Sequence, residues 1–284
     1  EITARPLTFS GTASVQDKVY DGTVSATADL ANLLFNGLLS GDSLGTAVAT
    51  FVDANAGDDK AVQVSFNGGQ GSNYSVPSLD GVTGSITPKS LAATGNVSDK
   101  TYDGTTDAAV TIGLSGLISG ETLGTSTVGA SFDSANAGVR TASIDSVTLA
   151  DNGAYLASNY TLATSDISFA SGDDTAVISA KSLTASATAA DKVYDRTTDA
   201  QVSFVLGGLV GSEDLGTPVY SASFASANVG SQALTLDSIQ LTNGSTGLSA
   251  NYALAAGDVT FAQSSAEITA RPLTFSGTAS VQDK

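Results

Sequence analysis

The sequence predicts an all-β protein of three tandem domains, each an antiparallel β-sandwich of the immunoglobulin-like kind. The 284 residues are rich in Ser, Thr, Ala, Val and Gly, and apolar residues alternate with polar ones over short segments. An internal repeat sets the number of domains at three. The alternative is a β-grasp-like domain with one short helix, because residues 28–39 could form a helical turn.

The alternation is clearest in the segment that opens each domain. Leu7, Phe9 and Val15 fall at odd positions of one extended stretch, and residues 183–189 show the same spacing. Every second side chain of a strand points to the same side of the sheet. These segments are therefore predicted to be strands with one buried and one exposed face.

The repeat is visible at two levels. Residues 267–284 repeat residues 1–18 letter for letter, which predicts a window cut from an array with a 266-residue period, a duplicated tag being the alternative. Within that period, an Asp-Lys-x-Tyr-Asp motif begins at residues 17, 99 and 191. Its spacing predicts domains at residues 1–87, 88–179 and 180–268, and the first strand of a next domain at residues 269–284.

Several residues recur in the same order in all three units, and we interpret them as structural positions. They are Tyr20, Asp21, Gly22, Tyr102, Asp103, Gly104, Tyr194 and Asp195 in the first motif, Asn55, Asn136 and Asn228 in an Ala-Asn-x-Gly motif, and Tyr74, Tyr160 and Tyr252 in an Asn-Tyr motif. The rings of Tyr20, Tyr102 and Tyr194 are expected to be largely buried. Arg196 replaces glycine in the third unit, which predicts a different turn there.

The junctions between units are short, as in Ile-Thr-Pro-Lys-Ser-Leu at residues 86–91, with no Gly/Ser-rich linker. A strand that leaves one domain should run almost directly into the next, which predicts a stiff rod on the order of 100 Å long. Leu273, Phe275, Ala279 and Val281 repeat the apolar face of the first strand. We expect a following domain, or a neighbouring subunit, to cover them.

The composition excludes much chemistry. The chain contains no Cys, His, Met or Trp, so it has no thiol nucleophile, no Cys or His metal ligand and no histidine base. A net charge of −17 repels phosphate backbones and anionic lipid surfaces, which argues against binding nucleic acid. No apolar run approaches the roughly 18–20 residues of a membrane helix, so membrane insertion of this segment is not predicted. The carboxylate pairs Asp58-Asp59, Asp173-Asp174 and Glu213-Asp214 are interpreted as solvated loop charge. No enzymatic activity and no cofactor are predicted.

Two alternatives concern the charged residues of the first motif. Aspartates spaced by four could bind calcium, at Asp99, Asp103 and Asp107 and at Asp191, Asp195 and Asp199, although a capped turn explains them better because the EF-hand spacing is missing. The recurring Lys18, Lys100 and Lys192 predict surface Lys–Asp pairs. A Lys–Asn isopeptide crosslink is the alternative.

The combined landmarks resemble a known family. Tyr-Asp-Gly-Thr, Leu-x-Gly-Asp/Glu, Ala-Asn-Ala-Gly, Asn-Tyr and Ile-Thr-Pro-Lys-Ser-Leu, in this order over nearly the whole chain, resemble the bacterial YDG-type repeat of large secreted, filamentous-haemagglutinin-like surface proteins. The resemblance implies an extracellular, cell-surface stalk or adhesin segment, serving attachment, cell–cell contact or a biofilm matrix. Its partners would be neighbouring repeats and host or environmental surfaces or glycans. A carbohydrate-binding module is the alternative, against which the absence of Trp argues.

Overall fold

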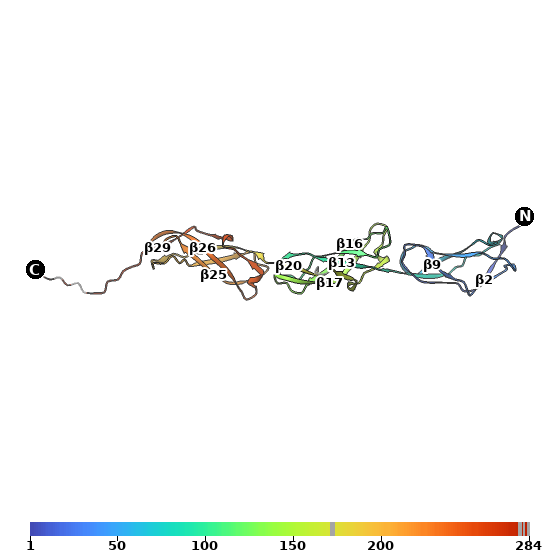
Figure 1. The fold of residues 1–284 in the computed structure, drawn as a ribbon, viewed down its shortest axis with the longest axis horizontal. Helices are drawn as coiled ribbons and strands as arrows, with labels where there is room; N and C mark the ends of the chain where they lie inside the picture. Colours follow the sequence, from blue (N-terminus) through green and yellow to red (C-terminus); the bar gives the residue numbers. More distant parts are fainter. Residues whose placement is uncertain (171–173, 278–279, 281, 283–284) are drawn as a thin grey trace. The chain divides into compact units, whose positions relative to one another are not determined.

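The structure, a computed structural model, describes residues 1–170, 174–277, 280 and 282 (Figure 1). Among these residues helical structure is confined to short 3-10 turns, and strands make up the rest of the regular structure, which confirms the all-β class. No described helix has the length and apolar character needed to cross a membrane. Residues 28–39 contain the strands β6 (Ala28–Asp29) and β7 (Leu33–Asn36) with a turn between them, so the short helix of the β-grasp alternative is not formed.

The chain forms two compact units, and the boundary between them passes through the second repeat. Unit 1 comprises Glu1–Val97, Ala109–Ser131 and Ser143–Asp174, and unit 2 comprises the remaining segments, Ser98–Ala108, Phe132–Ala142 and Thr175–Lys284. The junction between repeats 1 and 2 therefore lies within unit 1, and the junction between repeats 2 and 3 lies within unit 2.

Repeat 1 (residues 1–87) is made of short strands around two longer ones. They are β1 (Arg5–Pro6), β2 (Thr8–Gly11), β3 (Ser14–Val15), β4 (Lys18–Val19), β5 (Ser25–Ala26), β6 (Ala28–Asp29), β7, β8 (Thr46–Phe51), β9 (Gly57–Asn67), β10 (Tyr74–Ser75) and β11 (Thr83–Thr87), with a 3-10 turn η1 (Gly71–Asn73) before β10.

Repeats 2 and 3 (residues 88–179 and 180–268) share one order of elements. Repeat 2 has β12 (Lys89–Ser90), β13 (Ala92–Val97), β14 (Lys100–Thr101), β15 (Val110–Ser115), β16 (Gly124–Phe132), β17 (Gly138–Ala150), η2 (Ala157–Asn159), β18 (Tyr160–Thr161), η3 (Thr164–Asp166), β19 (Ile167–Phe169) and β20 (Thr175–Ser179). Repeat 3 has β21 (Lys181–Ser182), β22 (Thr184–Ala189), β23 (Lys192–Val193), β24 (Val202–Gly207), β25 (Leu215–Phe224), β26 (Gly230–Asn243), η4 (Ser249–Asn251), β27 (Tyr252–Ala253), η5 (Ala256–Asp258), β28 (Val259–Phe261) and β29 (Ser265–Thr269).

The sheets are mixed, so the prediction of purely antiparallel sheets was wrong. In repeat 3 the sheet orders are β24-β22-β28 and β23-β29-β26-β25, and repeat 2 has the matching orders β15-β13-β19 and β14-β20-β17-β16. The strand β22 is antiparallel to β24 but parallel to β28. Alternation of apolar residues reports which face of a strand is buried and says nothing about the direction of its neighbours.

The predicted alternation on the opening strands is confirmed. Leu7 is 3% exposed, and its counterparts Leu91 and Leu183 are 3% and 1% exposed. Ala185, Ala187 and Ala189 are also buried on β22. In repeat 3, Ala187 and Ala189 pack in one hydrophobic cluster with Ala222, Phe224 and Ile268, so small side chains contribute many of the contacts of that core.

Consecutive repeats are joined with almost no linker. In unit 1, β11 ends at Thr87 and β12 begins at Lys89; in unit 2, β20 ends at Ser179 and β21 begins at Lys181. A single hydrophobic cluster in unit 1 contains Tyr20 and Ile86 of repeat 1 together with Leu91 and Tyr160 of repeat 2. The core of repeat 1 therefore continues into repeat 2.

Candidate functional site: the repeat junctions

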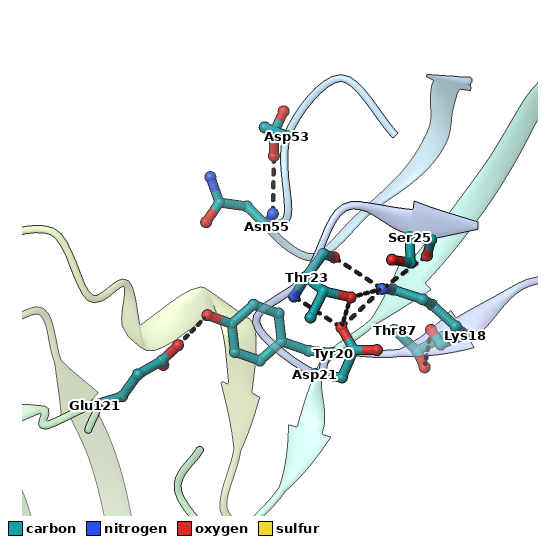
Figure 2. Close-up of polar contacts among 9 residues, drawn as sticks. All are labelled: Lys18, Tyr20, Asp21, Thr23, Ser25, Asp53, Asn55, Thr87 and Glu121. Atoms are coloured by element: carbon teal, nitrogen blue, oxygen red, sulfur yellow. Dashed lines mark hydrogen bonds and ion pairs between the residues drawn. The ribbon is translucent and has the colours of Figure 1, made fainter. Parts of the chain in front are cut away.

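The first motif folds into a turn held by a lysine. In repeat 1 the Lys18 ammonium donates hydrogen bonds to Asp21 Oδ1 (2.7 Å), to the backbone oxygen of Thr23 (2.8 Å) and to that of Ser25 (3.0 Å). Figure 2 shows these contacts converging on one nitrogen. The ammonium also lies 5.9 Å from the ring centroid of Phe51. One cation therefore satisfies several acceptors of this loop at once.

The same lysine contacts recur, which confirms the predicted Lys–Asp pairs. Lys100 and Lys192 lie 2.8 Å and 3.0 Å from the carboxylates of Asp103 and Asp195. Arg196 takes a φ of 74°, close to the 76° of Gly22, so the prediction of a different turn in repeat 3 was wrong. An arginine in this left-handed region carries a strain that glycine avoids, and the surrounding contacts hold the turn regardless.

The aspartates considered for calcium have separate partners. The Asp99 carboxylate accepts a hydrogen bond from the Val177 N–H (2.7 Å), whereas that of Asp103 faces Lys100. Asp107 contributes its backbone oxygen to the same lysine (3.0 Å). Repeat 3 repeats these roles with Asp191, Asp195 and Asp199. Among the residues that the structure describes, no three acidic side chains are grouped so that they could hold a metal ion.

These donors also stabilise the charged carboxylates. Hydrogen bonds from Thr197 and Lys192 lower the pKa of Asp195 to about 2. Partial burial opposes this effect at Asp21 and Asp103, but lysine and threonine donors still lower the pKa of both.

The first junction is built around a glutamate of repeat 2. Tyr20 reaches out of repeat 1 and donates its hydroxyl to Glu121 Oε1 (2.7 Å), as seen in Figure 2. Tyr160 of repeat 2 donates to the other oxygen, Oε2 (2.6 Å), and its hydroxyl accepts the Ile118 N–H (3.1 Å). The two rings meet edge to face with centroids 5.3 Å apart. Both oxygens of one half-buried carboxylate are thus used by tyrosines from two repeats.

The second junction, in unit 2, repeats this geometry. Tyr102 donates to Glu213 Oε1 (2.5 Å) and Tyr252 donates to Oε2 (2.6 Å), while the Tyr252 hydroxyl accepts the Val210 N–H (3.0 Å). The ring centroids are 5.4 Å apart. The interpretation of Glu213 as solvated loop charge was therefore wrong, and Asp173 of a second such pair lies outside the described residues.

A buried asparagine completes each junction. In unit 1, Asn159 of repeat 2 is 1% exposed; its side-chain oxygen accepts the Ala56 N–H (2.8 Å) and its side-chain nitrogen donates to Asn55 Oδ1 (3.1 Å). A buried amide is costly unless its donors and acceptor are satisfied. The preceding repeat supplies these partners, so Asn159 is stable in the interior only when repeat 1 is in place.

The second junction has the same pair of amides. Asn251 of repeat 3 is 2% exposed, accepts the Ala137 N–H (2.9 Å) and donates to Asn136 Oδ1 (3.0 Å). The recurring Asn55 and Asn136 are therefore docking residues and not crosslinking partners of lysine. Their counterpart Asn228 in repeat 3 is exposed.

Repeat 3 leaves its own Tyr194 only half-buried, whereas Tyr20 and Tyr102 are each 5% exposed. The prediction of a largely buried ring was thus confirmed for two tyrosines and wrong for Tyr194. In the first two repeats this burial comes from the segment of the next repeat that carries Glu121 or Glu213. We call this segment, residues 118–121 in repeat 2 and 210–213 in repeat 3, the corner of its repeat. Leu273, which has the sequence position of Leu7, is 81% exposed. Of the four residues predicted to await a following domain, Ala279 and Val281 lie outside the described residues.

Repeat 1 has a segment that corresponds to the glutamate-bearing segments of repeats 2 and 3. Tyr74 donates its hydroxyl to Asp42 Oδ2 (2.5 Å) and accepts the Leu39 N–H (3.3 Å), as Tyr160 does with Glu121 and Ile118. Leu39 is 52% exposed. This corner is therefore assembled from within repeat 1 before any neighbour contacts it.

The junctions keep their tyrosines neutral. Burial and a hydrogen bond to Glu213 raise the pKa of Tyr102 to about 12, and burial and a hydrogen bond to Glu121 raise that of Tyr160 to about 12. The pKa of Tyr20 is raised by the same causes. A phenolate here would be poorly hydrated and would face a carboxylate, so deprotonation disrupts the junction.

Sequence reasoning missed the junction role of four residues that contact the preceding repeat: Glu121 and Glu213, which accept the tyrosine hydroxyls, and Asn159 and Asn251, which accept a backbone N–H. The signal that could have found them is their recurrence: an acidic residue lies two positions before the Leu-Gly-Thr sequence of each repeat, and an asparagine precedes each tyrosine of the Asn-Tyr motif. Their partners lie 101 to 115 residues away. Nothing in the local sequence connects the two sides.

The repeats match a known family along most of the chain. The YDG domain matches three times, at residues 3–81, 87–167 and 179–260. Comparison with curated proteins and with solved structures gives no match. Because the matches cover well over half of the sequence, the chain belongs to the YDG domain family and consists of three tandem copies.

Proposed function

We propose that this chain is a structural segment of an extracellular bacterial fibre or stalk, in which each YDG domain fixes its neighbour. The observation that supports this function is the use of the same contacts at two successive junctions: two tyrosines on one glutamate, and one buried asparagine on a backbone N–H. Directional hydrogen bonds combined with a shared apolar core resist bending far better than a flexible linker does.

The proposed surroundings follow from this role. The segment would stand at the surface of a bacterial cell, in a filamentous-haemagglutinin-like protein, with neighbouring repeats as its immediate partners. It would support attachment to host or environmental surfaces or glycans, cell–cell contact or a biofilm matrix. The strong negative charge of the chain keeps neighbouring fibres apart in solution. Its contribution is mechanical, and no catalysis is proposed for it.

Small-angle X-ray scattering tests the stalk. We expect the scattering profile of a rigid, elongated particle. From the rise per residue of its strands, its maximum dimension should be on the order of 100 Å. The double variant Glu121→Ala/Glu213→Ala should give a flexible profile. Glu267→Ala removes one negative charge from an exposed position of β29 and should leave the profile unchanged.

A flexible profile for the unmodified chain would contradict the stalk. Binding of the chain to defined sugars on a glycan array, undisturbed by the two junction variants, would favour a carbohydrate-binding module instead.

A further inference from the structure

Arg196 stands where the first two repeats have glycine. The three residues share the left-handed conformation, with φ of 76° at Gly22, 81° at Gly104 and 74° at Arg196. Because the backbone turn is the same, a Cβ leaves it in the same direction in each repeat. The surroundings of the two glycines therefore indicate where the Arg196 side chain points when another repeat follows.

In the first two repeats that direction leads into the next repeat. A Cβ at Gly22 would lie 3.3 Å from Ile118 Cγ2 and 3.4 Å from Glu121 Oε1. A Cβ at Gly104 would lie 2.9 Å from Val210 Cγ1. An arginine has six further heavy atoms beyond its Cβ, so it does not fit against a corner of the repeat 2 or repeat 3 type.

The corner of repeat 1 differs at the matching position. Asp42 replaces Glu121 and Glu213, which shortens the acidic side chain by one methylene group. Its carboxylate is half-buried and uses Oδ2 for the Tyr74 hydroxyl (2.5 Å). Arg196 therefore brings a positive charge, and the corner of repeat 1 carries a carboxylate on a side chain that is one methylene group shorter than that of Glu121 or Glu213.

We propose that repeat 3 docks onto a following domain of the repeat 1 sequence, and that an ion pair between Arg196 and that domain's Asp42 selects it. The proposal rests on the stalk function and adds a rule for the order of its domains. Burial of the planar guanidinium against a carboxylate favours a fixed, bidentate geometry.

Two observations identify the occupant. Residues 267–284 are identical to residues 1–18, so the chain that leaves repeat 3 has the opening sequence of repeat 1. At this end a hollow of about 600 Å³ is lined by Tyr194, Arg196, Val229 and Leu273, among others. Val229 and Leu273 are 52% and 81% exposed. At the two junctions within the chain, the leucines that correspond to Leu273 are buried. The backbone N–H groups that correspond to that of Val229 donate to a buried asparagine of the next repeat.

Hydrogen exchange on an extended chain tests the docking. The protein is residues 1–284 followed directly by residues 19–87, so that a second copy of repeat 1 follows repeat 3. The reporter is the Val229 amide, whose counterparts Ala56 and Ala137 donate to buried asparagines. We expect its exchange to slow at least ~10-fold relative to the unextended chain.

A charge reversal tests the ion pair. In the extended chain, Arg196→Asp should return the Val229 exchange rate to that of the unextended chain. Adding Asp42→Arg in the second copy of repeat 1 should restore at least half of the lost protection, on a logarithmic scale. In the unextended chain Arg196→Asp should not change the rate. The Ala137 amide serves as an internal reference for an intact fold.

Each other result overturns a defined part of the proposal. Unchanged protection of Val229 in the Arg196→Asp variant, or no recovery in the double variant, overturns the ion pair and leaves the stalk standing. An unprotected Val229 in the extended chain, with Ala137 protected, overturns docking at repeat 3. Fast exchange at both Ala56 and Ala137 would instead contradict the stalk itself.

Discussion

The turns that carry Tyr102 and Tyr194 are the same structure in two settings. Both backbone N–H groups donate to a strand that closes their own repeat, Tyr102 to Ser179 at 2.8 Å and Tyr194 to Thr269 at 2.9 Å. Both turns contain an ion pair between a lysine and an aspartate. The rings nevertheless differ: that of Tyr102 is 5% exposed, and that of Tyr194 is half-buried.

The difference separates what a repeat does for itself from what its neighbour does for it. Each repeat forms the backbone of its turn from its own residues, because the lysine and the closing strand are both internal. The burial of the ring and the use of its hydroxyl depend on the following repeat. Matched substitutions in the Tyr102 turn and the Tyr194 turn therefore measure how much the following repeat contributes to stability.

The largest expected effect is that of removing a junction ring. Tyr102→Ala should lower the free energy of unfolding by about 3–5 kcal/mol, as for other buried aromatic residues. Tyr194→Ala should lower it by about 1 kcal/mol, because its ring is already partly exposed. Urea denaturation followed by circular dichroism measures both. Equal losses would show that the neighbour adds nothing.

The shared glutamate is expected to come next. Glu213→Ala leaves two tyrosine hydroxyls without their charged acceptor and should cost about 2–3 kcal/mol. Asp42→Ala deprives only Tyr74 of its acceptor and should cost about 1–2 kcal/mol in the same denaturation experiment. A cost at Asp42 as large as that at Glu213 would contradict the double use of the glutamate.

The asparagines offer a similar comparison at smaller amplitude. Asn251→Ala leaves the Ala137 N–H without its acceptor and should cost about 1–2 kcal/mol. Asn73, at the same position of repeat 1, is exposed, and Asn73→Ala should change stability by less than ~0.5 kcal/mol. Thermal denaturation of the two variants distinguishes them, and identical melting curves would count against a docking role.

Alkaline pH should weaken the junctions. Burial, followed by the bond to Glu213, raises the pKa of Tyr102 to about 12, so the folded state holds its proton more tightly than the unfolded state does. This contribution is complete below about pH 10 and is lost as the pH rises from about 10 to 12. The Tyr102→Phe variant has no proton to lose at this position. Between about pH 10 and 12, its free energy of unfolding should therefore fall less steeply than that of the unmodified chain, by about 1 kcal/mol per pH unit. Parallel plots of unfolding free energy against pH for the two proteins would contradict a stabilising role for the neutral Tyr102 hydroxyl.

Calcium should have the smallest effect. The Asp103 carboxylate faces Lys100, and the Asp99 carboxylate accepts a backbone N–H, so these two side chains do not form an oxygen cage for the ion. Adding CaCl₂ or EDTA should leave the urea midpoint unchanged. A midpoint that rises with calcium in the unmodified chain but not in Asp103→Asn would restore the calcium interpretation.

The sequence was sufficient for the parts that are local or repeated. Alternation identified the buried face of β22, and recurrence identified Tyr20, Tyr102 and the lysine pairs. It could not supply the direction of β28, because parallel and antiparallel neighbours bury the same face. It also could not connect Tyr20 to Glu121, since that contact depends on how two domains meet and not on any local preference.

The one-residue spacing between Thr87 and Lys89 limits how such an array can change in length. Loops within the repeats vary freely: Gly57 and Tyr74 are 17 residues apart, whereas their counterparts in repeat 2 are 22 apart. At the spacer, however, one inserted residue would reverse the alternation that places Leu91 in the core. Insertions and deletions are therefore expected within the loops of a domain, or as the gain or loss of a whole domain. As the copies diverge, the spacers between domains should keep a constant length while the loops change.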